Sequence, residues 1–359
     1  MIISVKKTIG LTFIMSGLIL AQSFGQKKEG IFSRKKIVNQ YSTVGIGGGS
    51  SHYFGDLAPL EFAYYGLYTN VRWNGTINYT RHLNENIAAR ASFTYARIFG
   101  DDYTFSKNNI SNATLAAHNI RNLHFRNDLQ EFVLSGIYNL LPQYGKGAKG
   151  RSSIMPYLTA GIGVYGHKPK AVLRSVENET YSSDIEWVAL RPLNTSGQNL
   201  PAGTLKNYSL VQFVAPVSIG VRLKISKSWD LKAEAGYRWT PTDFLDDVGN
   251  TNYPNLTELG SNFGDVAKWM SFRADEDLVA ANPKFRGTSN NNRISDYLNA
   301  VPVVTGTNPP GGSSPSNSVK NYYSPDLHKR GTKGADSYLL FQVTLNYVLS
   351  NNIKCPVIR

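Results

Sequence analysis

Long segments in which apolar and polar residues alternate constrain this chain more than any other feature of its sequence. In Ser337–Leu349 every second residue from Leu339 onward is apolar, and polar residues such as Gln342 and Thr344 lie between them. A period of two is that of a β-strand with one apolar face. Such segments occur eight times, at Tyr41–Ser50, Val71–Arg81, Ile87–Ile98, Leu129–Leu141, Ile154–Tyr165, Val211–Ile225, Trp229–Thr240 and Ser337–Leu349.

The length of these segments separates two kinds of β-protein. They run to about ten to fifteen residues, whereas strands in soluble proteins average about 5–6. A tilted strand that crosses a membrane needs roughly 9–11 residues, and aromatic residues at strand ends, such as Trp229 and Trp239, suit the lipid–water boundary. We therefore expect an all-β fold, an eight-stranded antiparallel transmembrane β-barrel with long extracellular loops, rather than a soluble β-sandwich.

The N-terminal segment has the pattern of a secretory signal peptide. Lys6 and Lys7 precede an apolar run from Ile9 to Ala21, and this run is shorter than the roughly 20 residues that a transmembrane helix needs. We expect residues 1–25 to be a signal peptide, residues 26–350 to form the barrel and residues 351–359 to be a periplasmic C-terminal tail.

The connections between the predicted strands alternate between short and long. Long connections fall at about 51–70, 100–128, 166–209 and 241–336. In outer-membrane barrels the short turns face the periplasm and the long loops face outward. We therefore expect an outer-membrane protein with both termini in the periplasm.

Charged residues fall on the polar face of the predicted strands, which points into the barrel. A barrel of eight strands has an interior only wide enough for side chains, so charges of both signs there must pair. We predict a filled, non-conducting lumen held by ion pairs among Arg72, Arg90, Glu131, Arg222, Glu234 and Arg238.

The net charge of +13, from 38 basic and 25 acidic residues, invites a nucleic-acid partner. Once the strands are placed, however, the basic residues divide among the lumen, the outer loops and a periplasmic rim, so we expect no nucleic acid. Lys146, Lys149 and Arg151 in one short turn and Lys354 in the tail belong to this rim. The rim either docks an acidic partner surface or anionic lipid headgroups, or it is a solvated edge that aids biogenesis.

Cys355 is the one cysteine of the chain, so an internal disulfide and a cysteine-cluster metal site are excluded. It follows the last predicted strand and would lie in the oxidising periplasm. An odd cysteine in an exported protein indicates either an intermolecular disulfide or a free thiol.

Several blocks resemble the PorG family of Bacteroidota outer-membrane barrels, which belongs to the type IX secretion system. The more specific blocks are Glu186–Gln198 (EWVALRPLNTSGQ) and Glu234–Val248 (EAGYRWTPTDFLDDV), and Gly47–Leu57 and Ile353–Pro356 add to them. The resemblance spans essentially the whole mature chain. It implies a non-enzymatic component of the secretion and gliding machinery that anchors or positions a periplasmic ring of a PorK-type lipoprotein and PorN. It also suggests a lipoprotein of this ring as the disulfide partner of Cys355.

Other functions have less support in the sequence. Asp243, Asp246 and Asp247 could ligate calcium through oxygen, but their spacing is not that of an EF-hand, and a turn or capping role is the simpler interpretation. The six histidines are scattered, and none has a serine and a carboxylate at a telling spacing. We therefore expect no catalytic residue, metal or cofactor. A surface receptor or adhesin, suggested by the large loops, and a lipid-modifying outer-membrane enzyme are the alternatives.

Overall fold

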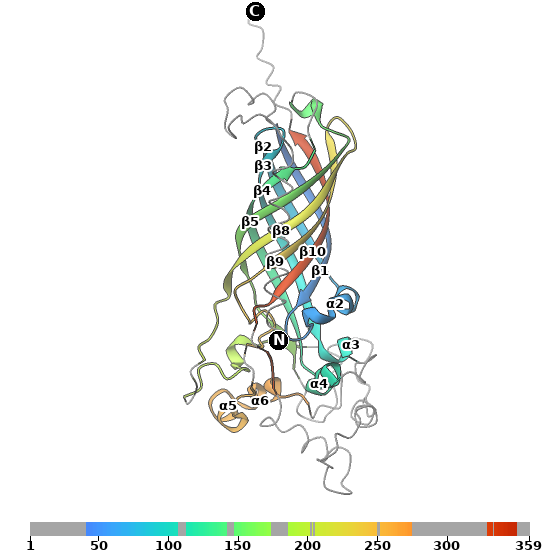
Figure 1. The fold of residues 1–359 in the computed structure, drawn as a ribbon. Coiled ribbons are helices and arrows are strands. Elements are labelled where there is room, and N and C mark those ends of the chain that lie inside the picture. The colour runs from blue at the N-terminus through green and yellow to red at the C-terminus, as the bar shows by residue number, and fades with distance from the viewer. Residues whose placement is uncertain are drawn as a thin grey trace, which may run out of the picture. The chain divides into compact units, whose positions relative to one another are not determined.

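The computed structural model describes residues 41–106, 113–141, 147–173, 186–201, 203, 205–249, 252–274, 329–332 and 334–349. Eight long strands form the framework: β1 (Tyr41–Phe54), β2 (Arg72–His82), β3 (Ile87–Asp101), β4 (His124–Asn139), β5 (Ile154–Gly166), β8 (Val211–Lys224), β9 (Trp229–Trp239) and β10 (Ser337–Leu349). They pair antiparallel in the order β3-β2-β1-β10-β9-β8-β5-β4, and the pairing of β3 with β4 closes the barrel (Figure 1). The predicted fold class is confirmed.

All eight predicted strands are present, and three of them extend by three or more residues beyond a predicted end. β1 continues to Phe54, β3 continues to Asp101, and β4 already begins at His124. The extensions of β1 and β3, which fall in the predicted loops, are buried on both faces, whereas Arg126 and Asp128 in the extension of β4 are partly exposed. Because both faces are covered, the sequence there loses the alternation that marks a half-buried strand.

Short turns join the strands at one end of the barrel, called here the short-turn end. Between β2 and β3, Asn84 Oδ1 accepts the backbone N–H groups of Asn86 and Ile87 at 2.9 and 2.7 Å. Between β8 and β9, Ser226 Oγ accepts the N–H groups of Ser228 and Trp229, each at 3.2 Å. Asn and Ser make such turns because their short side chains replace a backbone acceptor.

The first and last strands are paired neighbours, with Ser42 opposite Leu349 and Phe54 opposite Ser337. β1 therefore begins, and β10 ends, at the short-turn end. The predicted segments 1–25 and 351–359 lie outside the described residues.

The outer face of the barrel is apolar over its middle. Side chains such as Ile46, Ile77, Leu134, Ile162 and Val217 point outward and are exposed. Aromatic side chains flank this belt, with Tyr79, Tyr138, Trp229 and Tyr347 toward the short-turn end and Trp73, Phe213 and Trp239 toward the other.

The height of this belt follows from β9. Trp229 and Trp239 stand at its two ends, which is about 33 Å along a strand. At the tilt of transmembrane barrel strands this gives about 25 Å, the usual height of their apolar band.

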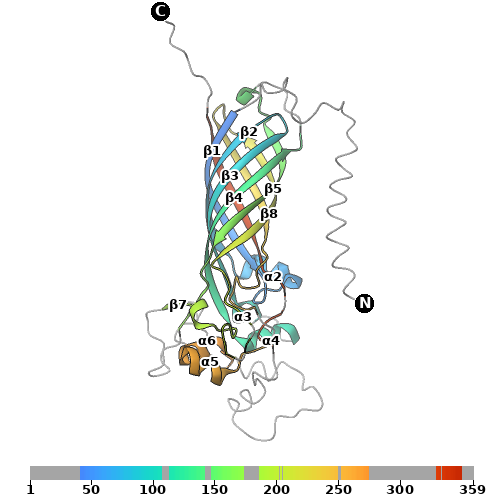
Figure 2. The same ribbon diagram turned by 90° about the vertical axis from the view of Figure 1, so that its left-hand side faces the viewer.

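Short elements gather at the opposite end, called here the loop end (Figures 1 and 2). The first long connection carries η2 (Leu60–Phe62) and α2 (Ala63–Thr69), and the second carries α3 (Asp102–Ser106) and α4 (Ala113–Arg121). The third carries β6 (Lys170–Val172), β7 (Trp187–Ala189) and η4 (Arg191–Leu193), and the fourth carries α5 (Leu256–Phe263) and α6 (Asp265–Ser271). One further short element, η3 (Gly147–Gly150), lies in the short turn between β4 and β5. No helix among the described residues is long and apolar enough to cross a bilayer.

These loop-end elements form a folded cap with a hydrophobic core. Side chains of the strand extensions, such as Tyr53 and Phe125, pack with Phe105 and Leu115 of the helices and with Leu245. Arg121, Arg273 and Arg330 are buried in the same region. The described parts of the four long connections are therefore structured and packed against the ends of the strands.

Candidate functional site

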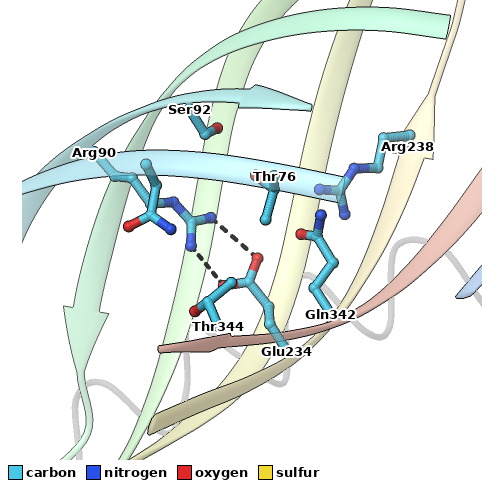
Figure 3. A pocket seen from close by; sticks show the side chains of 8 residues that line it. Thr76, Arg90, Ser92, Glu234, Arg238, Gln342 and Thr344 are labelled. Carbon is cyan, nitrogen blue, oxygen red and sulfur yellow. Dashed lines mark hydrogen bonds and ion pairs between the residues drawn. The ribbon is translucent and has the colours of Figure 1, made fainter. Parts of the chain in front are cut away.

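The centre of the lumen is held by an ion pair between Arg90 of β3 and Glu234 of β9. Arg90 Nη1 lies 2.6 Å from Glu234 Oε2, and Nη2 lies 3.0 Å from Oε1 (Figure 3). The Tyr157 hydroxyl donates to Glu234 Oε2 at 3.0 Å. Beside the pair is a cavity of about 20 Å³ lined by Thr76, Asn78, Ser92, Arg238, Gln342 and Thr344, which is room for about one water molecule.

A second charged group lies nearer the loop end. The Tyr338 hydroxyl donates to Glu131 Oε2 at 2.5 Å, and Arg238 Nε is 3.7 Å from the same oxygen. Both side chains of this ion pair are almost fully buried. Arg90, Glu234, Glu131 and Arg238 are thus the predicted lumen residues that the structure joins in ion pairs.

A third ion pair, between Arg151 and Asp230, lies buried at the short-turn end of the lumen. Arg151 Nε donates to Asp230 Oδ1 at 3.1 Å, and neither side chain is exposed. The other guanidinium nitrogens donate to the carbonyl oxygens of Ala148, Ser226 and Lys227 at 2.6, 3.0 and 3.1 Å. One arginine therefore ties two neighbouring short turns to the base of β9.

Three of the predicted roles need correction. The sequence predicts Arg151 in an exposed rim, but the residue is buried because its side chain turns inward to Asp230. Arg72 makes no ion pair with any described residue; its guanidinium lies 3.9 Å from the centre of the Phe99 ring. Arg222 donates to the Tyr41 hydroxyl at 2.9 Å instead of pairing with a carboxylate.

Arg222 also lies directly opposite Lys232 in the register of β8 and β9. Both side chains are buried, and Arg222 Nε and Nη2 and Lys232 Nζ have no hydrogen-bond partner among the described residues. Like charges in directly opposed positions repel each other. The base of the lumen therefore carries more positive than negative charge.

The exposed part of the basic rim is smaller than predicted. Lys149 in η3 and Lys227 in the β8–β9 turn are exposed. The predicted partner-binding residues Lys146, Lys354 and Cys355 lie outside the described residues. Lys149 and Lys227 are therefore the rim lysines whose position the structure describes as accessible.

At the loop end, Arg121 of α4 holds three segments of the cap together. It donates from Nη2 and Nε to Asp102 Oδ1 and Oδ2 at 2.7 and 2.8 Å. It also donates to the carbonyl oxygens of Asp56 and Arg330, at 2.8 and 2.7 Å. Burial alone would raise the pKa of Asp102, but the adjacent Arg121 and His118 hold that pKa below its usual value.

The two more specific blocks of the family resemblance contact each other in the cap. The hydroxyl of Thr195 donates to the Asp247 carboxylate, and that of Ser196 donates to the Asp247 carbonyl oxygen at 2.8 Å. Tyr208 donates to Asp247 Oδ1 at 2.7 Å. Arg330 donates to the Asp247 carbonyl oxygen at 3.2 Å, so it brings a later part of the last long connection to the same junction.

Several carboxylates are buried close together where the cap meets the barrel. The Tyr53 hydroxyl lies 2.6 Å from Asp246 Oδ2 and 3.1 Å from Asp336 Oδ1. Burial raises the pKa of Asp246 and of Asp336 well above the usual value, and nearby Asp56 adds to both shifts. Burial also raises the pKa of Asp243 to about 7.

Asp246 of the block Glu234–Val248 and Asp336 both supply hydrogen-bond acceptors for turns of the cap. Asp246 Oδ1 accepts the Val248 N–H at 2.8 Å, and Asp336 Oδ2 accepts the Leu245 N–H at 2.9 Å. Within the described residues, no group of three or more histidine, cysteine, aspartate or glutamate side chains is arranged to hold a metal ion.

One contact has the outline of part of a hydrolytic site. His118 Nδ1 lies 3.0 Å from Asp102 Oδ1. The neighbouring Ser106 hydroxyl, however, donates to the Asp102 carbonyl oxygen at 2.6 Å, and its side chain is buried. A nucleophile needs its hydroxyl directed at the base and open to substrate, and Ser106 meets neither condition.

Sequence reasoning missed the residues that organise the cap. Tyr53, the pair Asp102 and Arg121, and the pair Arg330 and Asp336 come from three separate parts of the chain and follow no period. Asp102 and Arg121 lie near the two ends of the same connection, and the sequence offers no signal that they form an ion pair.

An apolar outer belt, a closed ring of eight antiparallel strands and a polar, ion-paired interior define the class of small transmembrane β-barrels. No family model and no curated protein matches the sequence. Among solved structures, Neisserial surface protein A is 12% identical with a TM-score of 0.30, over 56% of this chain and 84% of that chain. OprG from Pseudomonas aeruginosa is 6% identical with a TM-score of 0.31, over 87% and 97%. Ail, the attachment invasion locus protein of Yersinia pestis, is 10% identical with a TM-score of 0.28, over 55% and 87%. Similarities at this level carry no argument about function.

Proposed function

We propose that this chain is a non-enzymatic outer-membrane component of the type IX secretion machinery, which anchors or positions the periplasmic ring of a PorK-type lipoprotein and PorN. In this proposal the short-turn end and both termini face the periplasm, and the cap faces outward. The observation that carries it is the junction of Thr195 and Ser196 with Asp247. The two blocks on which the PorG resemblance rests form one structural unit there, which favours a shared architecture over two chance matches.

The membrane placement has independent physical support. The apolar belt is bounded by Trp229 and Trp239 on β9 and has about the height of the apolar band of an outer-membrane barrel. The alternation of short and long connections supports the proposed orientation, since outer-membrane barrels keep their short turns in the periplasm.

The filled interior favours attachment over transport or catalysis. Arg90–Glu234 crosses the lumen, Arg151–Asp230 is a buried ion pair at its short-turn end, and the cavity beside the first pair has a volume of about 20 Å³. A solute larger than water would have to displace these ion pairs to pass.

The proposal is tested by purification from the native cell in mild detergent, with partners identified by mass spectrometry. We expect ring proteins to co-purify, and a reducible higher band on non-reducing gels that Cys355→Ser removes. Without any ring protein in the preparation, the attachment role is wrong. Recovery of the ring without a reducible band excludes only the covalent link.

The rim is tested by the double charge reversal Lys149→Glu and Lys227→Glu. Both side chains are exposed at the short-turn end. Lys268→Glu in α6 is the control, because it reverses an exposed charge at the loop end. We expect less ring protein with the double variant than with the control; equal recovery would assign the rim to solvation. Arg151 is unsuitable here because it is buried.

A second candidate function is a surface receptor, which the folded cap favours. The cap packs α3, α4 and α6 against the strand ends, and such a scaffold can present a stable outer surface. Exchange of residues 252–274 for a short linker would separate the two functions. Retained secretion would assign these residues to surface recognition, while trapped cargo would assign them to the secretion role.

A further inference from the structure

The segment from η2 through α2 exposes large apolar side chains on the side that faces away from the protein. Leu60, Tyr64, Leu67 and Tyr68 are 61%, 74%, 37% and 52% exposed. Leu67 and Tyr68 lie three and four residues after Tyr64 in α2, so these three side chains share one face of that helix, and Leu60 precedes them in η2. In a soluble protein this face would be expected to pack inward.

The opposite face of the segment packs against the cap, so the segment cannot rotate to bury its exposed apolar side chains. Phe62 and Tyr65 pack against the hydrophobic core of the cap, both next to Phe105. Gly66 is buried against β1, where an added Cβ would lie 3.0 Å from the Phe54 ring. This close approach fixes α2 against the strand and leaves the second apolar face exposed.

The position of α2 along the barrel indicates which environment its exposed apolar face contacts. α2 ends at Thr69, and three residues later β2 begins with Arg72 and Trp73. Trp73 is 50% exposed, stacks on the Tyr95 ring with centroids 5.5 Å apart, and belongs to the aromatic band that bounds the apolar belt. Figure 1 shows α2 beside the loop-end part of β1.

We propose that Leu60, Tyr64, Leu67 and Tyr68 bind the boundary between headgroups and acyl chains in the lipid leaflet at the loop end. The inference rests on the membrane placement in the proposed function and extends it to an element outside the strands. The exposed face continues the lipid-facing surface past Trp73. Tyrosine suits this depth, because its ring enters the apolar layer while its hydroxyl stays with the headgroups.

The charge around the face agrees with lipid contact. Glu61 in η2 is exposed. The helix α2 itself contains no charged residue. An interfacial helix is held by the apolar area that it buries in the boundary. We expect the helix to lie along the membrane surface around the barrel.

Spin labels on the full-length protein in phospholipid vesicles test this inference. The background is Cys355→Ser, and single cysteines replace Tyr64, Ile77 or Ser261. Ile77 is exposed on the apolar belt and reports on the membrane placement itself, whereas Ser261 of α5 is an exposed cap position. Power-saturation spectra give the ratio of collisions with oxygen, which concentrates in lipid, to collisions with a water-soluble nickel chelate. Mobility on unheated gels confirms that each variant is folded.

We expect the ratio at Tyr64→Cys to be several-fold above that at Ser261→Cys and to approach that at Ile77→Cys. If position 77 is lipid-exposed and position 64 is water-exposed, the helix proposal is wrong and the membrane placement stands. Shielding of position 64 from both reagents also overturns the proposal, since protein then covers the face. A water-exposed position 77 overturns the membrane placement and the helix proposal together.

Discussion

Arg90 of β3 and Glu234 of β9 are joined across the lumen by two hydrogen bonds, of 2.6 and 3.0 Å, although 144 positions separate them in the chain. Their side chains are 12% and 6% exposed, so neither charge is compensated by bulk water. The pair therefore links opposite walls of the barrel, and its removal tests how the lumen is held.

Arg90→Ala is expected to lower the free energy of unfolding by about 3–5 kcal/mol, because it leaves the buried Glu234 carboxylate without its partner. The double variant Arg90→Met with Glu234→Leu is expected to recover much of this loss, since no charge is left uncompensated. Urea unfolding of the vesicle-inserted protein measures both. Additive losses in the double variant would mean that the two residues act independently.

The same buried pairing predicts different outcomes for two basic residues of one short turn. Arg151→Ala removes the ion pair with Asp230 and three carbonyl contacts, so we expect a loss of about 3–5 kcal/mol. Lys149→Ala, two positions earlier, removes an exposed side chain and is expected to change stability by no more than about 0.5 kcal/mol. Equal urea midpoints for the two variants would contradict the buried position of Arg151.

This contrast shows where sequence reasoning succeeds and where it stops. Alternation predicts which way each strand residue points, and so it placed Arg90 and Glu234 correctly in the lumen. Lys146, Lys149 and Arg151 read as one exposed basic turn, because nothing in a turn sequence shows that one side chain bends back to Asp230. Arg72 likewise has the inward parity of a lumen residue but packs on Phe99 near the loop end.

The cap was not predictable for a related reason. Its contacts, such as Arg121 with Asp56 and Arg330 with Thr195, join connections that have no hydrophobic period. Composition therefore described these connections only as long loops. The family resemblance marked two of the blocks but gave no indication that they touch.

The buried carboxylates of the cap predict that its stability falls as pH rises. The folded-state pKa of Asp246 and of Asp336 is raised by burial and by neighbouring carboxylates, although Arg121 partly opposes the shift at Asp246. The folded state then binds protons more tightly than the unfolded state, so stability is lost as pH rises from the unfolded pKa near 4 through the folded pKa. The folded-state pKa of Asp247 is about 6, so its contribution is lost between about pH 4 and pH 6. That of Asp243 is about 7, so its contribution is lost between about pH 4 and pH 7.

Hydrogen exchange at the Leu245 and Val248 amides, corrected for the intrinsic rate, measures this effect. We expect lower protection at pH 8 than at pH 5 and a smaller difference in Asp336→Asn. The pKa of Asp102 is lowered, so that residue acts in the opposite sense, below about pH 4. Protection that increases from pH 5 to pH 8 would show that these carboxylates are already ionised and compensated in the folded cap.

Gly47 of β1 is a position where we expect the barrel to tolerate no side chain. A Cβ at Gly47 of β1 would overlap the carbonyl oxygen of Val343 and the backbone of Thr344 on β10. Because this obstacle is backbone, it moves only if the two strands separate. Gly47→Ala is therefore expected to cost about 1–3 kcal/mol, the usual range for overpacking.

Gly166→Ala is the matched control, because a Cβ at the end of β5 meets nothing within 4 Å. We expect this variant to keep the urea midpoint of the parent protein and its mobility on unheated gels, while Gly47→Ala unfolds at lower urea. The comparison depends on the close approach of β1 to β10, the pair of strands that brings the two ends of the barrel sequence together. An unchanged Gly47→Ala barrel would mean that this approach is looser than the structure gives it.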